Sequence, residues 1–169
     1  MFDLNVLFQE VYTSRDPFYD PFAPYQGDQW ENLFRFKSEL FSLLNENIEK
    51  KDSWGIESTL AIMFWDGVDK DYLDILLSLL DQKWHYAQEN IVSALEDIKD
   101  PRSIDKLYET AIHIPDDDEM RSLAIKCIQA LWAINTPEAI EKLKLLQQSS
   151  DSILHENAKI YLEDLTSTK

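Results

Sequence analysis

Three carboxylates, those of Asp74, Asp105 and Glu141, each directly follow a leucine or isoleucine in three similar stretches of the sequence. An acidic side chain that recurs beside an apolar anchor is expected on the same side of each stretch, so the three would form a column of negative charge. Carboxylates arranged in this way bind the cationic side chains of another protein. The other residues that we assign to this candidate partner-binding surface are Asp69, Asp71, Tyr72, Tyr108 and Glu109.

Residue types that support catalysis or metal binding are few and scattered. His85, His113 and His155 lie too far apart in the sequence for a local metal-binding motif. Cys127 is the only cysteine, which excludes an intrachain disulfide and a paired-cysteine metal site, and we expect it to be a buried structural thiol. No nucleophile motif and no glycine-rich phosphate loop occurs. We therefore expect no enzyme activity, no cofactor and no metal site.

One acidic segment, "HIPDDDE" at residues 113–119, contains three consecutive aspartates. Aspartate oxygens are ligands for hard cations, but this segment lacks the glycine and the alternating spacing of a calcium-binding loop. The favoured interpretation is a solvated loop whose carboxylates stabilise the start of the next helix.

The charge of the whole chain restricts its partners. The sequence of 169 residues contains 32 acidic and 16 basic side chains, a formal net charge of −16, so it should repel nucleic acid and attract a basic protein. Hydrophobic residues make up 44%, which predicts a folded chain. The first residues contain neither a basic segment nor an apolar run long enough for a signal or a membrane span. We therefore expect a cytoplasmic protein that binds neither membrane nor nucleic acid.

A repeat organises the second half of the chain. "IKDPRSIDKL" at residues 98–107 is echoed by "INTPEAIEKL" at residues 134–143, an offset of 36 positions. Before each proline, apolar residues recur with the spacing of one helix face. Proline ends the first helix and suits the first turn of the next, with Asp100 and Thr136 as the helix N-caps. Each copy is therefore predicted to be a helix, a tight turn and a second helix.

Weaker signals extend this pattern in both directions. Leu60, Met63 and Phe64 predict the buried face of an earlier copy, whose turn is the segment 67–69. We expect a capping helix after Asp151, and two helices in the first 52 residues, joined by a proline-rich and aromatic loop at 14–28 that either packs on them or binds a ligand. We predict one domain, 1–169, comprising N-terminal helices and loop (1–52), helical hairpins (53–150) and a cap (151–169).

Tandem helical hairpins bury their apolar faces by stacking on one another. The pair "AQENIVSALEDIKDPRSIDKL" and "LAIKCIQALWAINTPEAIEKL" resembles HEAT repeats, although the offsets of about 31 and 36 are shorter than is usual for that family. The resemblance covers residues 53–165 and implies an all-α fold, a short right-handed α-solenoid of HEAT-like hairpins with an N-terminal helical extension.

Enzymes with HEAT-like repeats fit the sequence poorly. "LHENA", with His155 and Glu156, resembles one of the His-Glu pairs that hold iron in deoxyhypusine hydroxylases, but the aligned positions of the other repeats lack such pairs. HEAT-like DNA glycosylases depend on a basic groove, which a chain of this charge does not offer. A lyase-like protein that positions a small ligand leaves no short motif, so that alternative stays open.

Small size, strong negative charge and helical repeats together resemble the all-helical bacterial immunity proteins of toxin systems. The resemblance implies a protein-binding module that neutralises a basic, nuclease-type toxin by occluding its active site. A non-catalytic scaffold or adaptor with HEAT-like repeats is the first alternative, and a small-ligand binder or lyase-like protein is the second.

Overall fold

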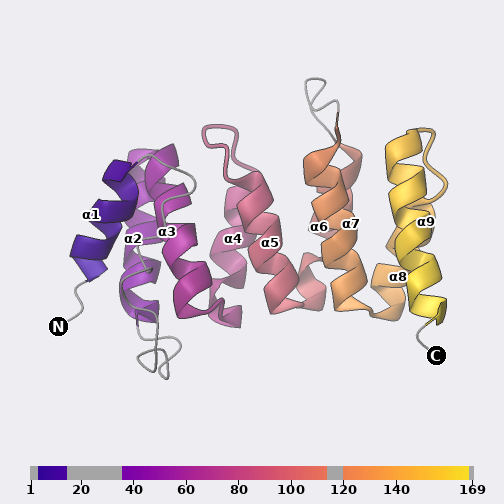
Figure 1. Ribbon diagram of the computed structural model, residues 1–169, viewed down its shortest axis with the longest axis horizontal. Coiled ribbons are helices and arrows are strands. Elements are labelled where there is room, and N and C mark those ends of the chain that lie inside the picture. Colours follow the sequence, from indigo (N-terminus) through magenta and orange to yellow (C-terminus); the bar gives the residue numbers. More distant parts are fainter. Residues whose placement is uncertain (1–3, 15–35, 114–119, 168–169) are drawn as a thin grey trace. The chain divides into compact units, whose positions relative to one another are not determined.

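The chain folds into α-helices joined by loops and short 3-10 turns (Figure 1). The computed structural model describes residues 4–14, 36–113 and 120–167, and within these ranges it contains nine α-helices and no strand. Two compact units are present: unit 1 comprises residues 1–72 and 82–87, and unit 2 comprises residues 73–81 and 88–169. Because the described residues form helices and no strand, the all-α prediction is confirmed.

Unit 1 is formed by α1 (Leu4–Ser14), α2 (Lys37–Lys50), α3 (Ser53–Asp66) and the 3-10 turn η3 (Lys70–Tyr72). The central element is α3, which contacts both α1 and α2. Its sequence is apolar on more than one face, and Ile56, Leu60 and Ile62 are all buried. A helix that is apolar around most of its circumference is stable only when neighbours cover it on several sides.

Polar contacts fix α1 to the beginning of α3. The indole Nε1–H of Trp54 donates to the carbonyl of Tyr12 at 2.6 Å, and the hydroxyl of Tyr12 donates to Oδ2 of Asp52 at 3.0 Å. Asp52 is also the N-cap of α3, because its Oδ1 accepts from the N–H of Gly55 at 3.0 Å. One carboxylate thus both starts α3 and holds α1.

Unit 2 contains six α-helices: α4 (Leu73–Leu80), α5 (Gln88–Ile98), α6 (Ile104–Ile112), α7 (Ser122–Ile134), α8 (Pro137–Leu146) and α9 (Ser152–Ser167). In this unit α5 contacts α7 and α7 contacts α9, while α6 contacts α8. Among the residues that are completely buried are Ile91, Leu107 and Leu131. The apolar faces predicted from the repeat therefore form the core of this unit.

The two repeated turns have the predicted caps. Oδ1 of Asp100 accepts from the N–H of Arg102 at 2.9 Å, and the hydroxyl of Thr136 accepts from the N–H of Ala139 at 3.3 Å. Before each cap stands a left-handed residue that ends the preceding helix, Lys99 with φ 54° and Asn135 with φ 51°. The first copy differs in one respect, because a 3-10 turn, η4 (Pro101–Ser103), precedes α6.

One residue of the weaker repeat was placed wrongly. Leu60 and Met63 are buried as predicted, but the side chain of Phe64 is 38% exposed. Phe64 follows Leu60 by four residues and so shares its side of α3, and the aligned residue of the next copy, Leu95, is completely buried. The exposure of Phe64 therefore reflects the neighbours around α3 and not the spacing along the helix.

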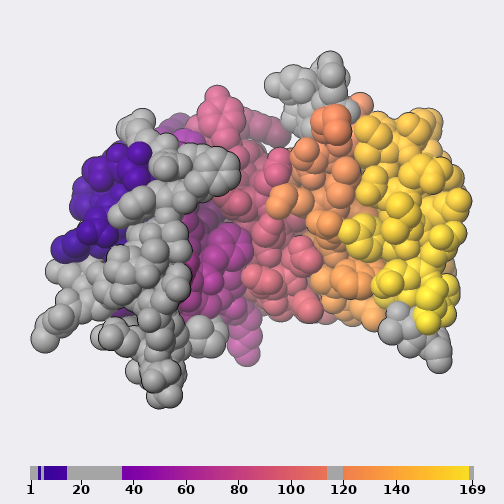
Figure 2. Space-filling model, viewed as in Figure 1, coloured from indigo at the N-terminus to yellow at the C-terminus, as the bar shows by residue number. Residues whose placement is uncertain are grey.

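The outer side of α9 is mostly polar, with the apolar Ile160 exposed among polar residues. Ser152, Glu156, Lys159 and Glu163 are exposed, whereas Leu154 and Ala158 on the opposite side are buried. In the space-filling view α9 covers one end of unit 2 (Figure 2).

Two predicted loops lie almost entirely outside the described residues. Of the proline-rich and aromatic loop at 14–28, only Ser14 is described, as the last residue of α1. Of the acidic segment at 113–119, only His113 is described, at the end of α6.

Candidate binding surface

Charged side chains of α4, η4, α6 and α8, and of Asp81 directly after α4, form ion pairs in unit 2. We call this surface the charged face. Its members are Asp74, Asp81, Arg102, Asp105, Lys106, Glu141, Lys142 and Lys144.

Two ion pairs on the charged face connect α4 to the following hairpin. The guanidinium of Arg102 lies 3.3 Å from Oδ1 of Asp74, and it also contacts the carboxylate of Asp100 at 3.2 Å. The second pair joins Lys106 of α6 to Asp81, which directly follows the last residue of α4. Arg102 is therefore shared between the N-cap of its own turn and a carboxylate of the preceding helix.

The next pair joins α6 to α8. The ammonium group of Lys142 lies 2.7 Å from Oδ1 of Asp105 and 4.7 Å from the centre of the Tyr108 ring. A lysine held over an aromatic face in this way gains a cation–π interaction in addition to the ion pair. Within α8, Lys144 pairs with Glu141 at 2.6 Å.

The carboxylates of the predicted column remain accessible despite these pairs. The side chains of Asp74, Asp105 and Glu141 are 86%, 82% and 68% exposed. Ion pairs this exposed contribute only about 0 to 1 kcal/mol each, so they exchange readily with other cations. The charged face is consequently a surface of alternating charge, on which each acidic residue of the column is already paired.

Glu109 also belongs to this region. Its side chain is exposed on α6, one turn beyond Asp105, and no ion pair involves it among the residues that the structure describes. Because residues four apart on an α-helix share a side, Asp105 and Glu109 together give α6 two carboxylates on one side.

Asp69 and Asp71 lie in unit 1, where both bind one lysine. The ammonium of Lys37 is 3.0 Å from Oδ1 of Asp69 and 2.6 Å from Oδ2 of Asp71. The N–H of Asp71 and the ammonium of Lys37 hold the pKa of the Asp69 carboxyl below its usual range. These two aspartates fasten the start of α2 to the turn η3 within unit 1.

Tyr72 is part of the core and is not a surface contact. Its side chain is completely buried and stacks on the ring of Phe41, and its hydroxyl donates to the carbonyl of Lys37 at 3.2 Å. Burial raises the pKa of this hydroxyl well above its ordinary value. Its predicted role as an aromatic contact for a partner is therefore wrong, because the ring is covered by its own unit.

The cations of the charged face were missed by the sequence analysis. A signal for them was present, since Lys106 and Lys142 occupy matching positions of the two repeats at the offset of 36. A basic residue that recurs two positions after a recurring apolar anchor could have been recognised as a partner for the recurring carboxylates.

Sites for other chemistry are limited. Within the described ranges, no group of three or more His, Cys, Asp or Glu side chains could hold a metal ion. The thiol of Cys127 is completely buried, and burial raises its pKa, so it is held in the unreactive protonated form. His155 contacts the carbonyl of Gln147 and lies 3.7 Å from Glu156, a local arrangement at the start of α9.

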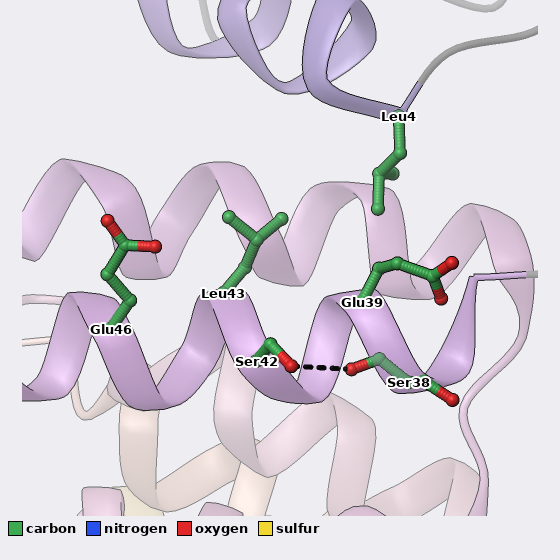
Figure 3. Close-up of a pocket in the computed structure, with 6 residues that line it drawn as sticks. All are labelled: Leu4, Ser38, Glu39, Ser42, Leu43 and Glu46. Carbon is green, nitrogen blue, oxygen red and sulfur yellow. Dashed lines mark hydrogen bonds between the residues drawn. The ribbon is translucent and has the colours of Figure 1, made fainter.

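Among the residues that the structure describes, two grooves are large enough for small molecules, and both open to solvent. One, of about 480 Å³, lies between α1 and α2, where Leu4 points toward the side of α2 that carries Glu39, Leu43 and Glu46 (Figure 3). The other, of about 410 Å³, lies in unit 2 and is lined mainly by α8 and α9, with Ile140, Leu162 and Leu165 as its apolar part. Neither encloses a ligand as a typical small-molecule site does.

No helix in the described part of the chain is both long enough and apolar enough to cross a membrane. Comparison of the chain with protein-family models, with curated protein sequences and with solved structures finds no match.

Proposed function

We propose that this chain is a non-catalytic protein-binding module, built from stacked HEAT-like hairpins, that presents the charged face of unit 2 to a basic protein. The observation that carries the proposal is that Asp74, Asp105 and Glu141 are all largely exposed and that each forms an ion pair on the charged face. In a stack of hairpins the second helices would be α4, α6 and α8, which are the helices that carry these three residues.

Binding would proceed by exchange of cations. Lysine and arginine side chains of the partner would replace the chain's own Arg102, Lys142 and Lys144 on the carboxylates. Each replacement costs little, because the existing pairs are exposed. The net charge of −16 would accelerate the encounter with a basic surface, and this acceleration would decrease as salt screens the charges.

The most specific form of the proposal is an immunity protein. A nuclease toxin has a basic cleft for the phosphates of its substrate, and a row of carboxylates would occupy that cleft in their place. Occlusion requires no catalytic residue in the bound protein. It is therefore compatible with a chain in which the sequence contains no nucleophile motif.

A basic nuclease domain encoded next to this chain is the partner to test. We expect tight binding, inhibition of the nuclease, and an association rate that falls steeply with salt. The triple variant Asp74→Asn, Asp105→Asn, Glu141→Gln should slow association by about ten-fold or more with an unchanged melting temperature. Stopped-flow fluorescence would measure the rate, and circular dichroism would check folding.

The matched control is Glu89→Gln, Glu156→Gln, Glu163→Gln, which removes the same charge from exposed positions of α5 and α9 in unit 2. Equal slowing by the two triple variants would mean that only net charge matters, and the charged face would be rejected as the binding site. Association that does not respond to salt would argue against a basic partner altogether.

An adaptor is the second candidate, and the alternation of charge on the charged face favours it. A surface with paired cations and carboxylates also fits a partner whose own surface carries both signs. For such a partner, neutralising Arg102 and Lys142 would weaken binding, whereas for a strongly basic partner the same change would strengthen it. That opposite response separates the two functions.

A further inference from the structure

Asp105 and Tyr108 of α6 already hold a cation. They are three residues apart and therefore share one side of the helix. Lys142 of α8 reaches this side, with its ammonium group 2.7 Å from Oδ1 of Asp105 and 4.7 Å from the centre of the Tyr108 ring. The carboxylate and the ring face thus act together on one positive charge.

We infer that Asp105 and Tyr108 form a receptor for an arginine side chain of the partner, and that Lys142 fills this receptor in the free chain. This inference rests on the proposed function and names the residue type that the charged face selects. Lys142 is then an internal competitor, which lowers the affinity for every incoming cation, arginine included.

Arginine suits this pair of residues better than lysine does. Its guanidinium is planar, so it can stack on the Tyr108 ring while two N–H groups bind the Asp105 carboxylate. An ammonium group is a compact, strongly hydrated charge that cannot do both equally well. The side chain of Asp105 is 82% exposed, so an incoming guanidinium can reach it.

Among α4, α6 and α8, only α6 offers the combination. The position that aligns with Tyr108 is Leu77 in α4 and Lys144 in α8, and neither supplies an aromatic face. Further along the same side of α6, Glu109 is exposed and Ile112 is 45% exposed. A segment whose arginine occupies the receptor would therefore meet a second carboxylate and then an apolar contact.

The test compares Lys142→Met with Lys144→Met. Both changes remove one positive charge from α8, but only the first empties the receptor, because Lys144 pairs with Glu141. Oligo-arginine and oligo-lysine peptides of equal length would be titrated into each protein, with amide NMR shifts of α4, α6 and α8 as the readout. Lys142→Met should strengthen oligo-arginine binding about three-fold to ten-fold, and Lys144→Met less than about two-fold.

A second variant tests the ring. Adding Tyr108→Leu to Lys142→Met keeps the charge unchanged and should abolish the preference for oligo-arginine over oligo-lysine. Thermal melting of each variant confirms that it is folded. A preference that survives Tyr108→Leu, or equal strengthening by the two lysine variants, would overturn the inference.

The experiment also separates this inference from the proposed function. The peptides could shift amides of α4, α6 and α8 equally with and without Lys142. That result would overturn the inferred receptor but would leave the charged face as the binding surface. An absence of shifts on these helices in every variant would overturn both.

Discussion

At the scale of single residues, a buried polar group fixes the contact between α2 and α3. The side chain of Asn47 is buried, and its amide Nδ2 donates to the hydroxyl of Thr59 at 3.1 Å, which in turn donates to the carbonyl of Gly55 at 2.7 Å. A buried polar side chain stabilises a fold when its hydrogen bonds are made, and costs free energy when they are lost. Close approach of the two helices here depends on the absence of a side chain at Gly55.

Gly55→Ala should destabilise unit 1. A Cβ atom at this position would lie 2.4 Å from Oδ1 of Asn47, so the buried amide would have to move. We expect the free energy of unfolding to fall by about 1 to 3 kcal/mol, even though alanine is the better helix former. Chemical denaturation of the full chain measures the change.

Asn47→Ala provides the control for this prediction through a double-mutant cycle. Once the Asn47 amide is gone, the Cβ atom has space, and Gly55→Ala should cost much less. Costs that simply add would show that the clash with Asn47 is not the cause.

At the scale of elements, three turns share one design that the sequence analysis recognised only twice. Each ends a helix with a left-handed residue, and an N-cap of the next helix follows: Lys51 with Asp52, Lys99 with Asp100, and Asn135 with Thr136. The turn between α2 and α3 has no proline, which is the residue that revealed the other two. The geometry is set by the left-handed residue and the cap, and proline only adds to it.

Glycine at the left-handed positions should stabilise the chain. Lys99 has φ 54°, a conformation in which a Cβ atom is strained, so Lys99→Gly should raise the free energy of unfolding by about 0.5 to 1 kcal/mol. The increase in the free energy of unfolding should be smaller for Asn135→Gly, because asparagine tolerates this conformation. Thermal and urea unfolding would measure both variants.

Lys159→Gly is the matched control, since Lys159 is exposed in the middle of α9. Glycine there should destabilise the chain by about 1 kcal/mol. A loss of stability in Lys99→Gly as large as that in Lys159→Gly would contradict the role assigned to the left-handed turn.

At the scale of the whole molecule, excess negative charge opposes folding, whereas the exposed ion pairs favour it only weakly. A formal net charge of −16 produces self-repulsion that is strongest in the compact state. The pairs of the charged face contribute only about 0 to 1 kcal/mol each. We therefore predict that the repulsion is the larger electrostatic effect on stability at neutral pH.

Added sodium chloride should consequently raise the melting temperature at neutral pH, because salt screens the repulsion among the excess carboxylates more than it weakens a few exposed pairs. The same titration near the sequence pI of about 4.4, where the net charge approaches zero, is the control and should show little or no increase. Differential scanning calorimetry would measure both series. A melting temperature that falls with salt at neutral pH would show that the ion pairs dominate.

What the sequence by itself determined about this protein is its helices, its caps and its repeated turns. These follow from local rules: apolar spacing places a buried face within one helix, and proline with a capping residue ends one helix and starts the next. For this reason Leu60 and Met63 were correctly predicted as core residues, and Asp100 and Thr136 as caps.

Only the tertiary structure decided which charges meet and which aromatic rings stay accessible. Arg102 pairs with Asp74 and Lys142 pairs with Asp105, in each case a carboxylate of a preceding helix. The ring of Tyr72 is covered by Phe41 of α2. All three contacts join residues that are far apart in the sequence. The pattern within one helix fixes the side on which a residue stands, but not what faces it. The predicted acidic column therefore became a face of paired charges, because its neighbours are set by how the helices pack.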